Sequence, residues 1–378
     1  MNYRTLFEGE MVSALGFGCM RLPTRNEGDK KCVDREKAIP MIRYAIDNGV
    51  NYVDTAYGYH DGESEVVVGE ALKGGYREKV TLATKLPPWR ISKTEDMRRV
   101  FEEQRERLGT DVIDVYLLHA LNKQSFEAIK GLGVFAFLDE LLKEGSIKHA
   151  GFSFHDGFET FKEIIDAYPF DICQIQMNYM DINEQATLEG MRYAKARGLT
   201  VVDMEPLRGG ILANVPGDVK AIFDTNTVRR APVDWALRYM LNFPEVATVL
   251  SGMGTMEQVK ENIGICSDAE AGCMTETELR IIEDVRACFE GREKVPCTEC
   301  DYCLPCPQNI SISRIFGMYN EAAVYDTWDG ARSQYKRRFQ DGGGAGDCTG
   351  CGECEERCPQ KIAISDRLKE AGAALSPA

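Results

Sequence analysis

The chain lacks three features that would assign it to common functional classes. None of its apolar runs approaches the about 18 residues that a membrane-spanning helix requires. Basic residues do not exceed acidic ones: 45 Lys and Arg oppose 60 Asp and Glu, which leaves a net charge of −15. Such a charge disfavours nucleic acid or an anionic membrane as the main partner. The N-terminal segment, with Glu8 and Glu10 before a glycine-interrupted apolar stretch, is a poor signal peptide, so we expect a cytoplasmic protein.

Cysteine, in contrast, is plentiful, with 14 residues in a chain of 378. In a large cytoplasmic protein, cysteines indicate metal binding or catalysis before disulfides. Eight of them lie after residue 290, whereas most of the excess negative charge lies before it. These two shifts predict a domain at residues 1–290 and a smaller one at residues 291–378.

The larger domain alternates short apolar runs with amphipathic helical patterns. Strands are expected at Val12–Phe17, Val50–Asp54, Lys79–Thr84, Val112–Leu118, Ile147–Phe152, Ile172–Gln176, Thr200–Met204 and Val246–Leu250. Helices are expected at Glu36–Asn48, Glu65–Lys73, Thr94–Leu108, Ser125–Lys143, Gly157–Ala167, Gln185–Arg197, Pro232–Leu241, Met256–Ile265 and Glu276–Phe289. Repeated strand–helix units of this number favour a closed (β/α)8 barrel. An open dinucleotide-binding sheet is rejected, because Gly16-Phe17-Gly18 is followed by Cys19-Met20-Arg21 and not by a G-x-G-x-x-G turn.

The smaller domain contains two cysteine runs. The first is Cys297-x2-Cys300-x2-Cys303-x2-Cys306-Pro307, and the second is Cys348-x2-Cys351-x2-Cys354-x3-Cys358-Pro359. The second matches the bacterial ferredoxin signature, in which the fourth cysteine binds the other of two clusters. Paired C-x2-C elements also suit zinc, which is the alternative. Two runs of four, each closed by Cys-Pro, favour two 4Fe-4S clusters, with Cys358 joining the first three cysteines and Cys306 joining Cys348, Cys351 and Cys354.

Between these runs, the pattern predicts an amphipathic helix at Ile312–Tyr325. A basic stretch from Arg332 to Arg338 follows it in an otherwise acidic chain. This stretch is the C-terminal end of a helix, a solvated face, or a surface that steers an acidic redox partner.

Three successive strands of the predicted barrel end in a titratable residue, namely Asp54, Lys85 and His119, and Tyr59 follows Asp54 in the next loop. The carboxyl ends of barrel strands carry catalysis in this fold, so we expect these four side chains to meet. Each alone has an ordinary structural explanation, such as a capping aspartate or a snorkelling lysine. Together they indicate a site in which Lys85, paired with Asp54, lowers the pKa of a general acid, Tyr59, and His119 orients a carbonyl.

The segment Asp54-Thr55-Ala56-Tyr57-Gly58-Tyr59, with Lys85 and His119, resembles the catalytic motif of the aldo-keto reductases. The resemblance runs from about Leu6 to Phe289, and the segment Val12–Leu22 resembles that family's barrel-bottom hairpin. Residues 291–378 resemble a mainly helical, ferredoxin-type dicluster domain, as in a subgroup of bacterial and archaeal members. The resemblance implies an oxidoreductase that acts on a small carbonyl or alcohol substrate.

It also implies a nicotinamide cofactor over the barrel mouth, NADP by preference with NAD as the alternative. Its contacts would be Ser153, Gln174, Met204, Pro206, Leu207, Arg208, Gly209, Ser251, Gly252, Met253, Gln258, Glu261 and Asn262. The glycine loop at Gly252 and Gly254 precedes a helix start, where free backbone N–H groups favour a phosphate. That loop contains no Lys or Arg before Lys260.

The expected function is hydride transfer between NAD(P)H and a carbonyl or alcohol substrate. The two clusters would be structural or would exchange electrons with a ferredoxin or flavoprotein. A bound flavin would connect two-electron hydride chemistry to one-electron clusters, but the sequence shows no flavin motif. The alternative function is an electron-transfer or docking subunit that keeps the barrel as a scaffold.

Overall fold

The chain folds into two compact units in the computed structural model, which describes residues 1–28 and 30–376. The first unit comprises Met1–Ala213 and Arg230–Glu276, and the second comprises Asn214–Arg229 and Thr277–Ala378. The boundary predicted at residue 290 stays a prediction: residue 290 ends α11 (Glu276–Glu290), whereas the two compact units divide after Glu276 and the second unit also includes Asn214–Arg229. Residues 377–378 of the predicted smaller domain lie outside the described residues. No described helix combines the length and the apolar character that a membrane span needs.

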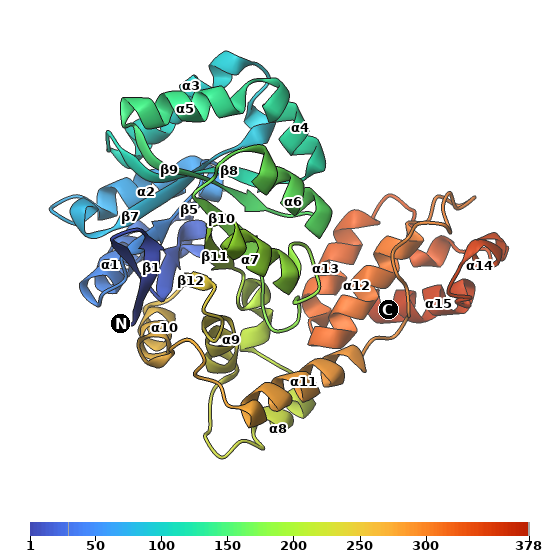
Figure 1. The fold of residues 1–378 in the computed structure, drawn as a ribbon. Helices are drawn as coiled ribbons and strands as arrows, with labels where there is room; N and C mark the ends of the chain where they lie inside the picture. The colour runs from blue at the N-terminus through green and yellow to red at the C-terminus, as the bar shows by residue number, and fades with distance from the viewer. Residues whose placement is uncertain (29, 377–378) are drawn as a thin grey trace. The chain divides into compact units, whose positions relative to one another are not determined.

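The first unit is a closed barrel of eight parallel strands, which confirms the predicted fold class (Figure 1). Around the barrel the strands follow the order β10, β11, β12, β3, β6, β7, β8, β9. Their bounds are β3 (Leu15–Gly18), β6 (Tyr52–Asp54), β7 (Thr81–Leu86), β8 (Ile113–Leu121), β9 (Ile147–Phe154), β10 (Ile172–Gln176), β11 (Thr200–Met204) and β12 (Val246–Gly252). Side chains such as Tyr52, Val115, Val202 and Leu250 fill the interior. Because the interior is packed, a ligand reaches the strand ends and not the barrel axis.

Helices surround the barrel (Figure 1). Their bounds are α1 (Arg35–Asp47), α2 (Glu63–Ala71), α3 (Thr94–Leu108), α4 (Lys123–Gly131), α5 (Val134–Glu144), α6 (Phe158–Ala167), α7 (Thr187–Ala196), α9 (Pro232–Leu241) and α10 (Met256–Asp268). The single helix predicted at Ser125–Lys143 is wrong, because Leu132 and Gly133 separate α4 from α5. Gly133 has a φ of +82°, a conformation that glycine adopts readily and that ends α4.

The first predicted strand, Val12–Phe17, is also wrong as one element. Val12 lies in β2 (Glu10–Ser13), which pairs antiparallel with β1 (Tyr3–Phe7), whereas Phe17 lies in barrel strand β3. The hairpin therefore occupies Tyr3–Ser13 and not the segment Val12–Leu22 that resembles one. A second hairpin, β4 (Thr24–Glu27) with β5 (Lys30–Val33), follows. Its mostly exposed, polar strands carry no apolar run that the sequence pattern would reveal.

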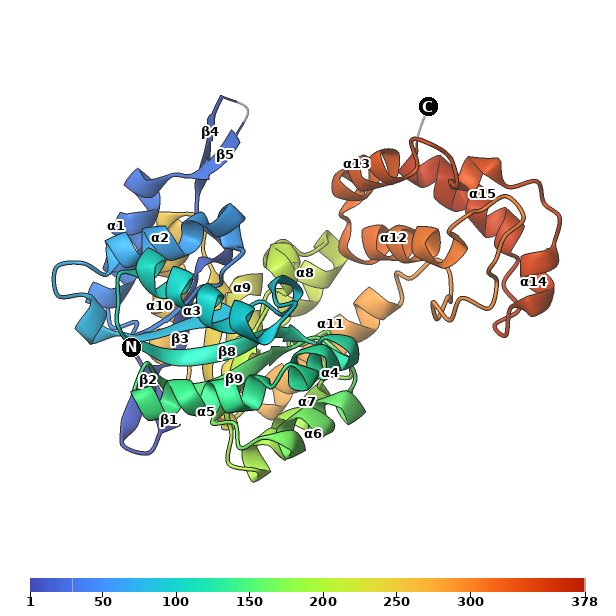
Figure 2. The same ribbon diagram turned by 90° about the horizontal axis from the view of Figure 1, so that it is seen from above.

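The second unit is mainly helical (Figure 2). Its helices are α8 (Gly217–Phe223), α11, α12 (Ile312–Tyr325), α13 (Trp328–Arg338), α14 (Glu353–Arg357) and α15 (Ile364–Leu375). Helix α12 has the predicted bounds and contacts both α13 and α15. Phe316 and Leu368 are fully buried in the core of this unit, and all cysteines of the two runs except the exposed Cys300 and Cys351 belong to that core or pack against it. Arg292 joins the end of α11 to α8 through two hydrogen bonds to Asp218, of 2.7 and 2.9 Å.

Candidate active site and cluster-binding cysteines

A pocket of about 950 Å³, partly open to solvent, lies at the carboxyl ends of the barrel strands. Every strand of the barrel contributes to its lining. In the order of the chain, these residues are Gly18, Asp54, Lys85, His119, Ser153, Gln174, Met204 and Ser251. Parallel strands in a closed barrel all point their carboxyl ends to one face, so residues far apart in sequence converge there.

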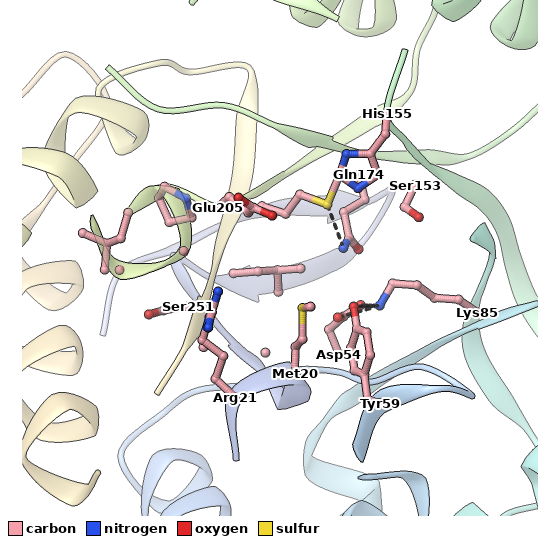
Figure 3. A pocket seen from close by; sticks show the side chains of 18 of the residues that line it. Met20, Arg21, Asp54, Tyr59, Lys85, Ser153, His155, Gln174, Glu205 and Ser251 are labelled. Carbon is pink, nitrogen blue, oxygen red and sulfur yellow. Dashed lines mark hydrogen bonds and ion pairs between the residues drawn. The ribbon is translucent and has the colours of Figure 1, made fainter. Parts of the chain in front are cut away.

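The structure brings Asp54, Tyr59 and Lys85 together as expected (Figure 3). The Lys85 ammonium lies 2.7 Å from both carboxylate oxygens of Asp54 and 2.8 Å from the Thr55 carbonyl. It lies 3.5 Å from the Tyr59 hydroxyl. Lys85 is fully buried and Asp54 almost so, which shields this ion pair from water. The arrangement therefore aims a fixed positive charge at the Tyr59 oxygen.

Burial and charge act in opposite directions on this group of residues. Burial raises the pKa of Tyr59 above 10.0, and the Lys85 ammonium opposes that rise. Burial alone would lower the pKa of Lys85, but the Asp54 carboxylate and Tyr59 outweigh it and raise the pKa. Tyr59 is therefore protonated and Lys85 is charged at neutral pH, the states in which tyrosine can donate a proton. We expected Lys85 to lower the pKa of Tyr59. Lys85 does act in that direction, but burial outweighs it and the net pKa of Tyr59 is raised.

His119 lines the same pocket as the ion pair. Its ring meets the Tyr59 ring edge-on, with centroids 5.8 Å apart, and the Trp89 ring at 5.0 Å. Burial, reinforced by Lys85, lowers the pKa of His119 to about 2, so the imidazole is neutral at physiological pH. Its buried Nδ1 has no hydrogen-bond partner among the described residues. A neutral imidazole can orient a carbonyl oxygen by hydrogen bonding but supplies no cationic acid.

A buried polar network supports Lys85 from the outer side of the barrel. Gln104 on α3 donates hydrogen bonds to Glu65, 2.7 Å away, and to the Lys85 carbonyl, 3.0 Å away. It accepts one from the Tyr116 hydroxyl at 2.8 Å. Thr84 also donates to Glu65, at 2.7 Å. Since these side chains are all fully buried, each would lose a required partner if the network were broken.

Arg107 extends the network to the loop that carries Tyr59. Its guanidinium forms an ion pair with Glu65 at 3.2 Å and donates to the Tyr57 carbonyl at 3.3 Å. It also lies over the Tyr57 ring, 4.3 Å from the centroid. Helices α2 and α3 thereby fix both the strand that bears Lys85 and the turn that bears Tyr59.

Three expected nicotinamide contacts lie side by side at the pocket. Ser153 accepts a hydrogen bond from the Ala120 backbone N–H at 2.7 Å, which leaves its hydroxyl proton free to donate. The Gln174 amide lies 3.5 Å from the sulfur of Met204, and its buried Oε1 has no partner among the described residues. An amide with an unsatisfied buried acceptor suits a ligand that carries N–H donors.

The other expected cofactor contacts divide into two groups. Pro206, Leu207, Gly209, Ser251 and Gly252 line the pocket. The remaining five are absent from its lining within the described part of the chain: Arg208, Met253, Gln258, Glu261 and Asn262.

Three of those five have partners that explain their positions. Arg208 pairs with Asp181 at 2.5 Å, and the Gln258 side chain accepts from the Gly254 N–H at 2.8 Å. Asn262 donates to Ser251 Oγ at 2.9 Å and so positions a lining residue.

The sequence did not point to Met20, Arg21 or Glu205, which also line the pocket. Met20 and Arg21 directly follow the first barrel strand, so their position after a strand end was an available signal. Glu205 follows β11 and has a φ of +60°, which no sequence pattern indicates for a glutamate.

In the second unit, each set of four cysteines expected to bind a cluster lines one small cavity. Cys297, Cys300, Cys303 and Cys358 line a cavity of about 340 Å³. Cys306, Cys348, Cys351 and Cys354 line a cavity of about 270 Å³. Each cavity thus takes three thiols from one run and the fourth from the other, the donor set and pairing of a dicluster ferredoxin. Cys300 and Cys351 are exposed, so each cavity has one edge at the surface.

Comparison with known proteins agrees with this geometry. Residues 14–278 match the model of the aldo/keto reductase family, and residues 296–363 match a 4Fe-4S dicluster domain. The NADH-specific methylglyoxal reductase of Escherichia coli is 29% identical over 292 residues, covering 65% of this chain and 88% of that protein. An aldo-keto reductase from Bacillus halodurans, solved in its holo form, superposes with a TM-score of 0.63 at 27% identity, covering 75% of this chain and 96% of that one.

A more distant structure, an aldo-keto reductase from Klebsiella pneumoniae in complex with NADPH, shows the same fold. It superposes with a TM-score of 0.60 at 22% identity, covering 76% of this chain and 96% of that one. Because the family model spans most of the first unit and the dicluster model spans both cysteine runs, the chain belongs to the aldo/keto reductase family of oxidoreductases and carries a C-terminal 4Fe-4S dicluster domain.

Proposed function

We propose that the barrel transfers a hydride between NAD(P)H and a small carbonyl or alcohol substrate. The observation that carries this proposal is the buried Lys85–Asp54 ion pair directed at the Tyr59 hydroxyl, inside a pocket to which all eight strands contribute. A scaffold without catalysis would have no need for a buried charged pair, because burying charges is costly unless they serve a purpose or are well compensated.

The residues present fit a nicotinamide. The unsatisfied Gln174 acceptor and the free hydroxyl proton of Ser153 complement the donor and acceptor of a carboxamide. When bound, the nicotinamide supplies or accepts the hydride, which is the chemistry that the protein's own side chains lack. The protein's task is to hold the substrate oxygen within reach of Tyr59 and to move one proton.

In reduction, Tyr59 donates its hydroxyl proton to the substrate oxygen, and Lys85 stabilises the phenolate that remains. In alcohol oxidation the same proton returns to Tyr59. Neutral His119 orients the substrate oxygen through a hydrogen bond, and Trp89 packs against its ring. Asp54 holds Lys85 in place and compensates its charge.

NADP remains the preferred cofactor in this proposal, with NAD as the alternative. One relative is an NADH-specific methylglyoxal reductase, and a protein of the same fold was solved in complex with NADPH, so the comparisons favour neither cofactor. Lys260, the first cation after the glycine loop, lies 5.6 Å above the Tyr44 ring.

For the second unit, we propose two 4Fe-4S clusters that exchange single electrons with a small acidic ferredoxin or a flavoprotein. The exposed cysteine at each cavity and the basic end of α13 support this role. A flavin on the partner would reconcile one-electron clusters with two-electron hydride chemistry. The cytoplasm, which keeps thiols reduced, is the compartment that we propose.

The test is NADPH and NADH oxidation by the anaerobically purified full chain with a panel of aldehydes, ketones and quinones. Turnover that depends on Tyr59 would support the reductase. Tight nicotinamide binding without turnover of any carbonyl, together with rapid cluster reduction by ferredoxin, would favour the scaffold alternative instead.

A further inference from the structure

The two cysteine runs of the second unit have the same backbone conformation around their second cysteine but different residues there. In the second run this cysteine lies between Gly350 and Gly352, whose φ angles are +70° and +80°. In the first run it lies between Glu299 and Asp301, whose φ angles are +52° and +60°. Glycine adopts such a left-handed conformation readily, whereas it is unfavourable for Glu and, to a smaller extent, for Asp. Strain at a place where the same chain shows an unstrained solution indicates a function for the two carboxylates.

Asp301 faces one of the two cavities that the cysteines form, which we name the Cys297 cavity and the Cys306 cavity after their first cysteines. Asp301 lines the Cys297 cavity, and Ser313, which lines it too, donates a hydrogen bond from its hydroxyl to the Asp301 carboxylate. Cysteine thiols aside, Asp301 is the one charged side chain among the described residues that line either cavity. The negative charge is therefore placed at one cavity and not at the other.

Glu299 adds a second carboxylate on the same side. A Cβ on Gly317 of α12 would meet Glu299 Oε1 at 2.7 Å, so the glycine leaves room for this carboxylate against the helix. Phe316, the neighbour of Gly317, lines the Cys297 cavity. The Glu299 carboxylate is thus held against the helix turn that forms a wall of that cavity.

In other respects the two cavities are built alike. Ile312, at the start of α12, lines both of them. The start of α15 contributes Ile364 to the Cys297 cavity and Ser365 to the Cys306 cavity. Each cavity also has one exposed cysteine. Because both cavities have similar helix starts and similar access to water, the carboxylates are the main electrostatic difference between them.

The glutamates of the second run do not reverse this difference. Glu353 pairs with Arg357 at 3.2 Å, and Glu355 accepts a hydrogen bond from the Ser365 backbone N–H at 2.8 Å. Glu356 is exposed. None of the three belongs to the lining of either cavity in the part of the chain that the structure describes.

We propose that Asp301, assisted by Glu299, makes a cluster in the Cys297 cavity harder to reduce than a cluster in the Cys306 cavity; this inference rests on the two clusters proposed above. Reduction adds one electron, and therefore one negative charge, to a cluster, and a nearby carboxylate opposes that addition. Net charge and hydrogen bonds around a cluster are among the means by which a protein sets its reduction potential. The first electron from a one-electron donor such as a reduced ferredoxin then resides in the Cys306 cavity, so the unit fills in a fixed order.

The experiment is an anaerobic redox titration of the full chain with dithionite, followed by electron paramagnetic resonance. The wild type should be reduced in two steps, but two steps alone do not decide, since the first electron repels the second even between identical clusters. The Asp301→Asn variant removes the charge and keeps the shape, and asparagine tolerates the left-handed conformation. It should favour reduction at the lower-potential step by about tenfold, which corresponds to about 59 mV for one electron, and leave the higher step in place.

The matched control is Asp329→Asn, which removes an exposed carboxylate of α13 that pairs with Arg332 and lies outside the described lining of both cavities. It should leave both steps unchanged. Asp301→Gly, which copies the second run, should act as Asp301→Asn does, and it carries the test if the asparagine variant loses its cluster. Unchanged potentials in an iron-replete Asp301 variant, or a rise of the higher step alone, would overturn this inference and leave the two clusters intact. A wild-type chain without iron and sulfide would overturn the proposed clusters themselves.

Discussion

At the scale of single residues, the Tyr59 hydroxyl is the group on which the proposed chemistry depends. Replacing Tyr59 by Phe removes the proton donor but keeps the ring that packs against His119. We expect carbonyl reduction to fall by about 10²–10⁴-fold, the usual contribution of a general acid. Nicotinamide binding should change little, which fluorescence titration would show. Near-normal turnover by Tyr59→Phe would remove Tyr59 from the acid role.

The pH dependence of activity tests Lys85. Its ammonium lowers the pKa of Tyr59 against the opposing effect of burial, so the Lys85→Met variant should have a higher Tyr59 pKa. Reduction needs protonated Tyr59, and its alkaline limb should therefore move to higher pH; oxidation, which needs the deprotonated form, should require higher pH. Profiles of kcat/KM in both directions check this, and an unshifted profile in an active variant would contradict it. His119, with a pKa of about 2, should add no inflection near 6.5.

The sequence allowed the four central residues to be predicted because each ends or follows an apolar strand. A polar residue at the end of an apolar run can be recognised in the sequence alone, without knowing how the barrel closes. Arg21 could not be predicted in the same way, since its contacts with Gly209 and Gly252 exist only when β3 pairs with β12, more than 200 residues later. The partners of Arg208 and Gln258, which draw them away from the pocket lining, were equally invisible.

At the scale of elements, strands β10 and β11 and helices α3, α9 and α12 have their predicted bounds, because each is a regular apolar or amphipathic run with clear ends. The wrongly predicted elements are those whose bounds depend on contacts with distant parts of the chain. Strand β2 and barrel strand β3 form one apolar run in sequence, yet they pair with different partners. Helix α8, which was not predicted, is short and is held by Arg292 from a distant segment.

Helix α3 should matter to catalysis through Gln104. The Gln104→Leu variant would remove the acceptor of the buried Tyr116 hydroxyl and the side-chain donor to the Lys85 carbonyl. We expect a loss of about 2–6 kcal/mol in the free energy of unfolding, from about 1–3 kcal/mol for each of the two groups, with a lower kcat. Denaturation of apo protein and steady-state kinetics measure the two effects. Glu102→Gln, on the exposed side of α3, is the control. A variant as stable and as active as wild type would show that the network contributes nothing.

The basic end of α13 gives a second element-scale prediction. Lys336, Arg337 and Arg338 are exposed in its last turn, where cations also stabilise the helix dipole. If they steer an acidic ferredoxin, changing all three to Glu should slow cluster reduction more than changing them to Gln, and added salt should slow the wild type. Anaerobic stopped-flow spectroscopy measures the rates. A salt-independent rate that is equal in all three proteins would leave the basic end with a purely structural role.

At the scale of the whole molecule, the second unit should contain about eight irons and eight sulfides per chain, as expected for two cubic clusters. Cys306→Ala removes a thiol from the cavity that it shares with Cys348, Cys351 and Cys354. We therefore expect this variant to lose about half of its iron, with the other cluster retained longer. Iron and sulfide analysis with electron paramagnetic resonance checks both statements. Zinc in place of iron after anaerobic purification would refute the clusters, and loss of the other cluster first would refute the pairing.

The exchange of one thiol between the two cavities has a consequence for how the protein matures. The cavity built on the first run closes only with Cys358, so the nascent chain cannot complete this ligand set until the second run has left the ribosome. If this cavity holds a cluster, insertion of that cluster must therefore follow synthesis of both runs. If both proposed clusters are bound, oxygen attack on one of them would release a thiol that belongs to the same run as three ligands of the other. Loss of either cluster would then also disturb the cysteine ligands of the other cluster.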